Sequence, residues 1–149
     1  FRAINPAAVG FAAAFVLQGL LLAYYGVVRG EVGFSSPSGI RRGVGIAFIA
    51  YASVLYPIVG WAMGERYPAV PIFGLTPCPL VIFTCAIMMM SVPPAPRALL
   101  GVPVLWSLIG GSAAVLLTMP QDLMLPIAAL VAVLDAYRRR PRSRYGVVP

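Results

Sequence analysis

Charged residues are scarce in this sequence. Only 10% of its 149 residues are Asp, Glu, Lys or Arg, and 60% are hydrophobic, whereas an ordinary soluble domain is about 25% charged. So few charges cannot cover the surface of a core that faces water. With a mean hydropathy of +0.91, the composition predicts an integral membrane protein surrounded by lipid.

Lysine and histidine are absent, so every positively charged side chain behind the net charge of +7 is an arginine. Without lysine, no Schiff base to retinal or to a carbonyl substrate can form. Without histidine, the usual axial ligand of haem and the commonest ligand of zinc and copper are missing. We therefore expect no enzyme activity, no catalytic residue and no metal site. Noncovalent binding of lipid, pigment or quinone stays open, because an apolar groove needs no signature residues.

Cysteine is also rare, and the two cysteines, Cys78 and Cys85, lie in one apolar run. On a helix, a spacing of seven residues separates them by about 10.5 Å along the axis. A disulfide needs Cα atoms within about 7 Å of each other. We therefore interpret both as small buried apolar residues.

Acidic residues are few, and all four lie in expected loops or at the ends of expected spans: Glu31, Glu65, Asp122 and Asp135. An ionisable group inside a membrane is by default a functional candidate, so this placement argues against a proton relay or a carboxylate metal site. Asp135 is expected to pair locally with Arg138 and Arg139. An acid/base pair would require tertiary folding to bring Glu65 and Asp122 together.

Five apolar stretches approach the roughly 20 residues that a membrane-spanning helix needs. They cover residues 7–28, 43–63, 77–92, 98–118 and 123–137. Asn5 and Pro6 fit the N-cap and first position of the first helix, and arginines at the end of the short fifth stretch can extend it to the interface. The predicted fold is thus all-α, a single polytopic transmembrane helix bundle of about five spans.

Arginine is distributed unevenly between the two ends of such a bundle. Alternation of the spans places nine arginines on the side of the C-terminus: Arg29, Arg41, Arg42, Arg97, Arg138, Arg139, Arg140, Arg142 and Arg144. Only Arg2 and Arg66 fall on the other side. Because cytoplasmic connections carry the excess of positive charge, we predict a cytoplasmic C-terminus with a basic tail over 138–149, in a bacterial inner or intracytoplasmic membrane. The arginines flank spans and form no basic soluble module, which argues against nucleic-acid binding.

Two stretches carry small residues at helical spacing. Gly10, Ala14 and Gln18 follow one another four residues apart, and Gln18 is the one strongly polar side chain well inside an expected span. We expect this face to pack closely against another helix, with an interhelical hydrogen bond from Gln18. A second set lies in the fourth stretch and comprises Ser107, Gly110, Gly111 and Ala114. Such faces serve packing within the chain or docking to another subunit, and the sequence does not choose between them.

The segment before the third helix is interrupted by helix-breaking residues, namely Gly74, Pro77 and Pro79, with Thr76 and Cys78 between them. Irregular backbone at membrane depth is tolerated where protein or water covers it, and in transporters such breaks expose helix ends to a substrate. The simpler interpretation is a helix start with Thr76 as N-cap and Pro77 at the first position.

Three parts of the chain resemble an uncharacterised family of bacterial multi-span membrane proteins that is defined by a domain of unknown function. They are residues 4–8 with 15–18, residues 73–79 with 82–84, and residues 105–111. The resemblance implies further membrane-spanning sequence upstream of Phe1. It carries no activity, cofactor or catalytic residue across.

The sequence therefore favours a non-catalytic accessory or structural subunit of a larger membrane protein complex. Its contacts would be membrane lipids and other membrane protein subunits. The alternatives are a permease or channel for a small neutral solute, and a subunit that binds a pigment, quinone or lipid noncovalently.

Overall fold

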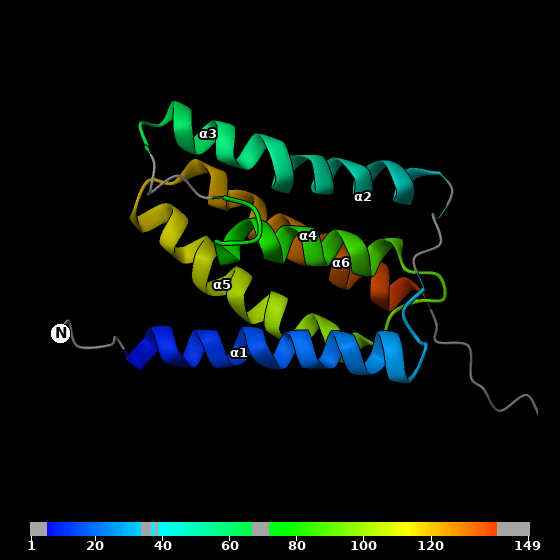
Figure 1. Cartoon of the computed structure of the whole chain (residues 1–149). Coiled ribbons are helices and arrows are strands. Elements are labelled where there is room, and N and C mark those ends of the chain that lie inside the picture. The colour runs from blue at the N-terminus through cyan, green and yellow to red at the C-terminus, as the bar shows by residue number, and fades with distance from the viewer. Residues whose placement is uncertain (1–5, 34–36, 38, 67–71, 140–149) are drawn as a thin grey trace, which may run out of the picture.

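The structure is a computed structural model that describes residues 6–33, 37, 39–66 and 72–139. It is built from helices joined by short connections (Figure 1). In chain order they are α1 (Pro6–Ala23) with the π-helical turn η1 (Tyr24–Val28), α2 (Ile40–Ala50), the π-helical turn η2 (Tyr51–Leu55), α3 (Tyr56–Ala62), α4 (Pro77–Met90), the 3₁₀ turn η3 (Arg97–Leu100), α5 (Gly101–Leu116), the 3₁₀ turn η4 (Pro120–Leu123) and α6 (Met124–Arg138).

These elements form five rods, and the prediction of an all-α bundle of about five helices is confirmed. Four rods are long and apolar enough to cross a membrane, and they cover Val9–Val28, Ile40–Ala62, Arg97–Leu116 and Pro120–Arg138. The last begins three residues before the expected stretch at 123, because η4 adds a turn in front of α6. The expected N-cap Asn5 and most of the basic tail, residues 140–149, lie outside the described residues.

The second rod stays continuous from Ile40 to Ala62 although Pro57 lies inside it. A proline lacks the backbone N–H, and its ring collides with the carbonyl group four residues earlier. The widened turn η2 ends two residues before Pro57, and α3 continues beyond this proline. A π-helical turn of this kind absorbs the misfit without ending the helix.

Helix α4 lies at the centre of the bundle, between α2 on one side and α5 and α6 on the other (Figure 1). Much of its surface is buried, including Val81, Ile82, Cys85, Met88 and Met89. With 14 residues, α4 is about 21 Å long, shorter than the roughly 30 Å hydrocarbon core of a bilayer. The surrounding helices, and not lipid, therefore cover most of this helix.

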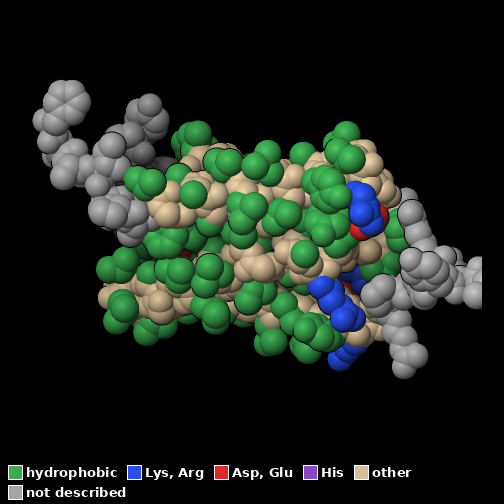
Figure 2. All heavy atoms as spheres, turned by 90° about the horizontal axis from the view of Figure 1, so that it is seen from below, with side chains coloured by type: hydrophobic (Ala, Val, Ile, Leu, Met, Phe, Trp, Pro, Cys, Tyr) green, Lys and Arg blue, Asp and Glu red, His purple; other side chains and the backbone are tan. Residues whose placement is uncertain are grey.

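Successive rods run in alternate directions, so the arginines at their ends collect at one end of the bundle. Figure 1 places the end of η1, the start of α2, the start of η3 and the end of α6 together. Figure 2 shows the corresponding blue side chains at one end of a surface that is otherwise largely hydrophobic. Arg66 follows α3 at the opposite end. The structure thus preserves the expected asymmetry for the arginines that it describes.

Candidate functional site

The amide of Gln18 joins α1 to the rest of the bundle. This side chain is 5% exposed, and its Nε2 donates a hydrogen bond to the carbonyl oxygen of Leu99 over 3.0 Å. Leu99 is itself fully buried in η3. The predicted small face does not extend along the whole helix, however, because a Cβ atom at Gly10 would meet nothing within 4 Å. Gly10 itself therefore takes no part in a close helix contact.

The small residues of α5 are occupied within the chain. A Cβ atom added at Gly110 would lie 2.6 Å from Leu125 Cδ1, and one at Gly111 would lie 3.2 Å from the Pro126 ring. Ser107 and Ala114 are also buried on α5. Gly110 and Gly111 therefore pack against α6 within the chain.

The interrupted segment ends where α4 begins, at Pro77. Gly74 has φ of +86°, a backbone conformation that suits glycine. Thr76 occupies the N-cap position, but its hydroxyl donates to the Ile72 carbonyl oxygen over 3.1 Å and makes no capping bond. The reason lies in the first turn: Pro77 and Pro79 have no backbone N–H, so little is left there for an N-cap oxygen to accept.

A buried polar cluster, which sequence reasoning missed, lies near the same end of the bundle. The Tyr56 hydroxyl donates to Asp122 Oδ1, and the Tyr51 hydroxyl donates to the Gln121 carbonyl oxygen over 3.0 Å. Asp122 is 6% exposed and Tyr56 is 3% exposed. Cys78 lies beside this pair. These contacts tie η2 and α3 to η4.

The cluster shows that Asp122, which was expected in a loop or at the end of a span, is buried at the start of a helical rod. The fourth apolar rod, Pro120–Arg138, contains both Asp122 and Asp135. The expected helix begins at residue 123, which leaves Asp122 in the preceding loop, whereas the helical rod starts at Pro120. An acidic residue shortly after a proline is a helix-start signal, and mid-span tyrosines need partners for their hydroxyl groups. Both signals were present in the sequence.

Replacing Tyr56 with phenylalanine is expected to lower the free energy of unfolding by about 2 kcal/mol, because it leaves a buried carboxyl group without its donor. Tyr51→Phe removes a hydrogen bond to a neutral carbonyl oxygen and should cost about 1 kcal/mol. Denaturant titration of both variants in detergent micelles, followed by circular dichroism, measures the difference. A Tyr56→Phe loss no larger than that of Tyr51→Phe would contradict the importance of Asp122 as a buried acceptor.

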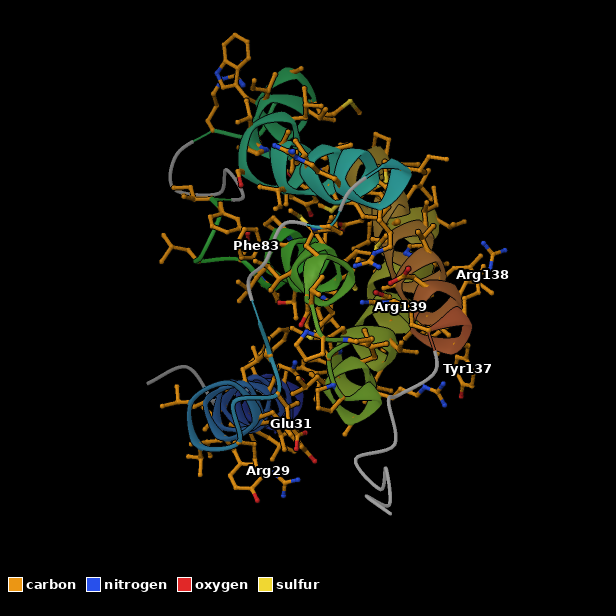
Figure 3. The ribbon with its side chains drawn as sticks, turned by 90° about the vertical axis from the view of Figure 1, so that its right-hand side faces the viewer. Arg29, Glu31, Phe83, Tyr137, Arg138 and Arg139 are labelled. Atoms are coloured by element: carbon orange, nitrogen blue, oxygen red, sulfur yellow. The ribbon has the colours of Figure 1, made fainter. Side chains whose placement is uncertain are left out.

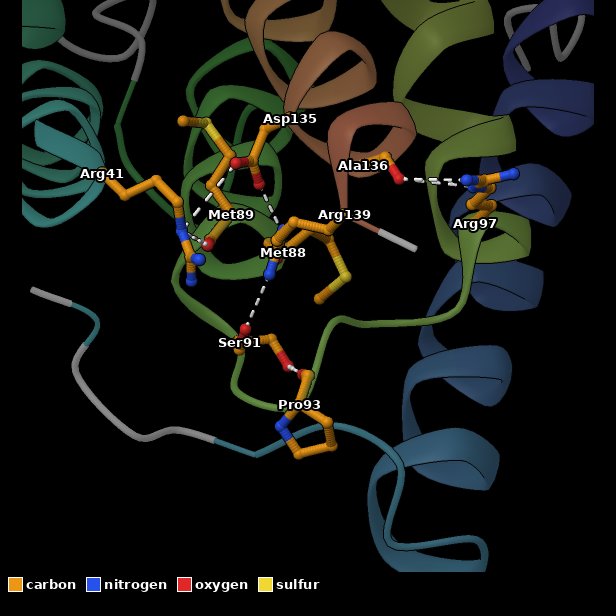
Figure 4. Close-up of polar contacts among 9 residues, drawn as sticks. All are labelled: Arg41, Met88, Met89, Ser91, Pro93, Arg97, Asp135, Ala136 and Arg139. Carbon is orange, nitrogen blue, oxygen red and sulfur yellow. Dashed lines mark hydrogen bonds and ion pairs between the residues drawn. The ribbon is translucent and has the colours of Figure 1, made fainter. Parts of the chain in front are cut away.

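At the arginine-rich end, Asp135 joins α6 to α2 (Figure 4). Its Oδ2 lies 2.5 Å from Nη2 of Arg139, and its Oδ1 lies 3.8 Å from Nε of Arg41. The predicted local pair therefore involves Arg139, and the structure adds Arg41 from α2. Burial lowers the pKa of the Arg139 guanidinium, and the Asp135 carboxylate opposes this shift.

The same two arginines satisfy the C-terminal end of α4. Arg139 donates to the carbonyl oxygens of Ser91, over 2.9 Å, and Met88, over 3.1 Å. Arg41 donates to the Met89 carbonyl oxygen over 3.3 Å. The last carbonyl groups of a helix have no partner inside it and carry the negative end of its dipole. The network centred on Asp135 is therefore a helix cap built from two other helices.

An apolar groove of about 470 Å³ lies between the first rod and α4. Phe83 projects from α4 in Figure 3, while Arg29 and Glu31 mark the end of the first rod. The lining comprises Leu22, Ala23, Gly26, Val27, Val32, Leu80, Phe83, Thr84 and Ile87. Thr84 is polar, but its hydroxyl donates to the Leu80 carbonyl oxygen over 2.8 Å. The groove can therefore accommodate hydrocarbon.

Among the residues that the structure describes, no three His, Cys, Asp or Glu side chains come together in a way that could hold a metal ion. The described residues form two buried polar clusters, one around Asp122 and one around Asp135, and an apolar groove between the first rod and α4.

Among known protein families, one that is described as a family of unknown function matches residues 1–146 of the chain. No curated protein and no solved structure matches it significantly.

Proposed function

Because the chain belongs to this family of unknown function, DUF6064, we propose a role from its own surface: a non-catalytic accessory subunit of a larger membrane protein complex. The observation that carries this proposal is the position of α1. The helix lies at the edge of the bundle (Figure 1), and only 6% of the residues in its most apolar stretch are buried inside the chain. Most of its surface is free to meet lipid or another protein.

One side of α1 is suited to a second helix. Ala12, Val16 and Gly19 are exposed and follow one another at steps of four and three residues. This spacing keeps residues on one seam between two packed helices. Small residues on such a seam let backbones approach closely inside a membrane, and a Cβ atom at Gly19 would meet nothing within 4 Å. The occupant that we propose is a transmembrane helix of a partner subunit.

The small face of α5 provides a comparison within the same molecule. There, Gly110 and Gly111 receive Leu125 and Pro126 of α6. Gly19 has no such counterpart among the described residues. The glycines of α5 are thus covered by another helix of the same chain, whereas no described residue covers Gly19 of α1. This difference supports a contact of α1 with another protein.

We further propose that the C-terminus faces the cytoplasm of a bacterial cell. Arg29, Arg41, Arg97 and Arg138 lie at the end of the bundle where α6 finishes. Positive charge concentrates on the cytoplasmic side of membrane proteins.

Replacing Gly19 with leucine is expected to weaken association with the partner at least about tenfold, because the added side chain separates the two backbones. Gly10→Leu is a matched control, since Gly10 is also open but lies nine residues away, on the other side of the helix. Gentle detergent extraction followed by native mass measurement compares the two variants with the unchanged chain. A partner-free monomer of the unchanged chain would refute the proposal, and so would equal complexes from all three.

Of the alternatives, noncovalent ligand binding has a specific observation in its favour, the apolar groove between the first rod and α4. A permease for a neutral solute has less support. The groove that the described residues form is apolar, and the amide nitrogen of Gln18 is engaged with Leu99.

A further inference from the structure

We propose that the outer side of α6, at its arginine-rich end, binds the phosphate headgroup of an anionic phospholipid. The side chains that would hold the phosphate are Arg97, Tyr137 and Arg138, and we call them the headgroup site. The inference goes beyond the proposed accessory role and depends neither on a partner helix at α1 nor on the apolar groove. Its basis is the fixed position of Arg97, the local excess of positive charge and the apolar surface that adjoins the site.

Arg97 is held in place across the end of α6. Its Nε and Nη2 both donate to the Ala136 carbonyl oxygen over 3.3 Å (Figure 4). Its guanidinium carbon lies 4.5 Å from the centre of the Tyr137 ring, within the range of a cation–π contact. Arg97 nevertheless remains exposed. A guanidinium that is already fixed at the surface loses little conformational freedom when it binds an anion.

Tyr137 and Arg138 extend the site outward. Figure 3 shows both side chains pointing away from the bundle at the end of α6, whereas Arg139 points into it. Tyr137 is 68% exposed, and tyrosine is typical of the level at which lipid headgroups lie. Guanidinium groups bind phosphate oxygens in a bidentate manner, and a phenol hydroxyl can donate to them as well. The site therefore presents several donors to one phosphate.

Positive charge is in excess at this site. The two acidic residues at this end of the bundle, Glu31 and Asp135, are paired with other arginines. Arg97 and Arg138 have no ion-pair partner among the described residues. Two guanidinium groups without a countercharge attract an anion from their surroundings. Anionic phospholipid is abundant in the cytoplasmic leaflet, which the distribution of arginine assigns to this end.

The adjoining surface favours a lipid over an acidic segment of another protein. Leu134 lies three residues before Tyr137 and four before Arg138, so it is a neighbour of both on the surface of α6. Leu130 lies one turn further along the same side. Leu130 is 60% exposed and Leu134 is 47% exposed. An acyl chain below the headgroup would cover both leucines, whereas an acidic loop would use only the charges.

The test uses the full chain, purified in mild detergent and delipidated. Phosphatidylglycerol, phosphatidylcholine and water-soluble glycerol phosphate are added separately, and native mass measurement gives the bound fraction of each. The unchanged chain is expected to bind phosphatidylglycerol at least about tenfold more tightly than phosphatidylcholine, since each arginine near the surface strengthens binding of an anionic lipid about fivefold. Glycerol phosphate should bind at least about tenfold more weakly than phosphatidylglycerol, because it has no acyl chain to cover the leucines.

Three variants separate a defined site from the general positive charge of this end. Arg97→Gln and Arg138→Gln should each lower the preference for phosphatidylglycerol about fivefold and leave phosphatidylcholine unchanged. Arg29→Gln is the matched control. It removes one positive charge from the same end of the bundle, but Figure 3 places Arg29 beside α1, away from Tyr137 and Arg138. Its effect on the preference should be less than about twofold.

Equal losses of preference in Arg29→Gln and in the two site variants would overturn the inference, as would equal binding of the two phospholipids by the unchanged chain. Glycerol phosphate that binds as tightly as phosphatidylglycerol would also overturn it and would identify a soluble anion as the ligand. If Arg97→Gln loses helical circular dichroism, Arg138→Gln still decides the question, because that side chain points away from the other helices. Binding is measured on the purified chain, so the absence of a partner subunit would leave this result unchanged.

Discussion

Replacing Asp135 with asparagine is expected to lower the free energy of unfolding by about 3 kcal/mol, because it removes the one negative charge from a partly buried group of guanidinium side chains. The carboxylate contacts Arg139 at 2.5 Å and Arg41 at 3.8 Å. Its side chain is 13% exposed and that of Arg139 is 14% exposed. Asparagine keeps the shape of the side chain but leaves two like charges facing each other.

Glu31→Gln is the matched control for this prediction. It breaks the ion pair with Arg29, whose side chain is half exposed, and an exposed pair contributes about 0–1 kcal/mol. Denaturant titration in detergent micelles, followed by circular dichroism, compares the two variants. If Asp135→Asn costs no more than Glu31→Gln, the network at the end of α4 is not the helix cap inferred from its geometry.

Replacing Gly110 with leucine is expected to lower the free energy of unfolding by about 3 kcal/mol through overpacking. The first added atom would lie 2.6 Å from Leu125 Cδ1. Leu125 is 0% exposed, so its side chain has little room to move aside, and α5 must separate from α6. Loss of this contact also disturbs the burial of Ser107 on the same face of α5.

The same substitution at Gly10 is the control, because open space surrounds that position. There, leucine has a higher helix propensity than glycine by up to about 1 kcal/mol, so Gly10→Leu should leave stability unchanged or raise it slightly. Thermal unfolding in micelles by circular dichroism distinguishes the two. Similar midpoints for Gly110→Leu and the unchanged chain would show that α5 and α6 are not tightly packed.

These predictions share a physical basis. In a membrane, apolar side chains stabilise helix contacts less than in water, because lipid tails are as apolar as leucine. Close approach of small residues and hydrogen bonds between helices then decide which helices pair. In this chain Gly110 and Gly111 provide the close approach, while Asp135, Gln18 and Tyr56 provide the polar contacts.

The interrupted segment shows how far local sequence signals extend. Pro77 does begin α4 and Thr76 does occupy the N-cap position. The hydroxyl of Thr76 nevertheless turns back to Ile72, because proline removes two of the first three backbone donors. The start of α4 could be predicted from Thr76 and Pro77. Its hydrogen bonds could not, because the N-cap pattern does not consider which residues of the first turn lack a backbone N–H group.

The sequence by itself determined the membrane class, the helical rods and the gathering of arginines at one end. Each depends on composition or on a stretch of about 20 residues. The thickness of the hydrocarbon core sets the length of such a stretch, whatever its tertiary contacts are.

Only the tertiary structure decided which polar groups meet. Tyr56 and Asp122 are 66 residues apart, and Gln18 and Leu99 are 81 apart. It also decided that the small face of α5 is filled by α6 while α1 keeps a free side. Hydrophobic periodicity gives the orientation of a helix toward an apolar environment, but protein core and lipid are equally apolar, so it cannot distinguish a buried face from one that faces the membrane.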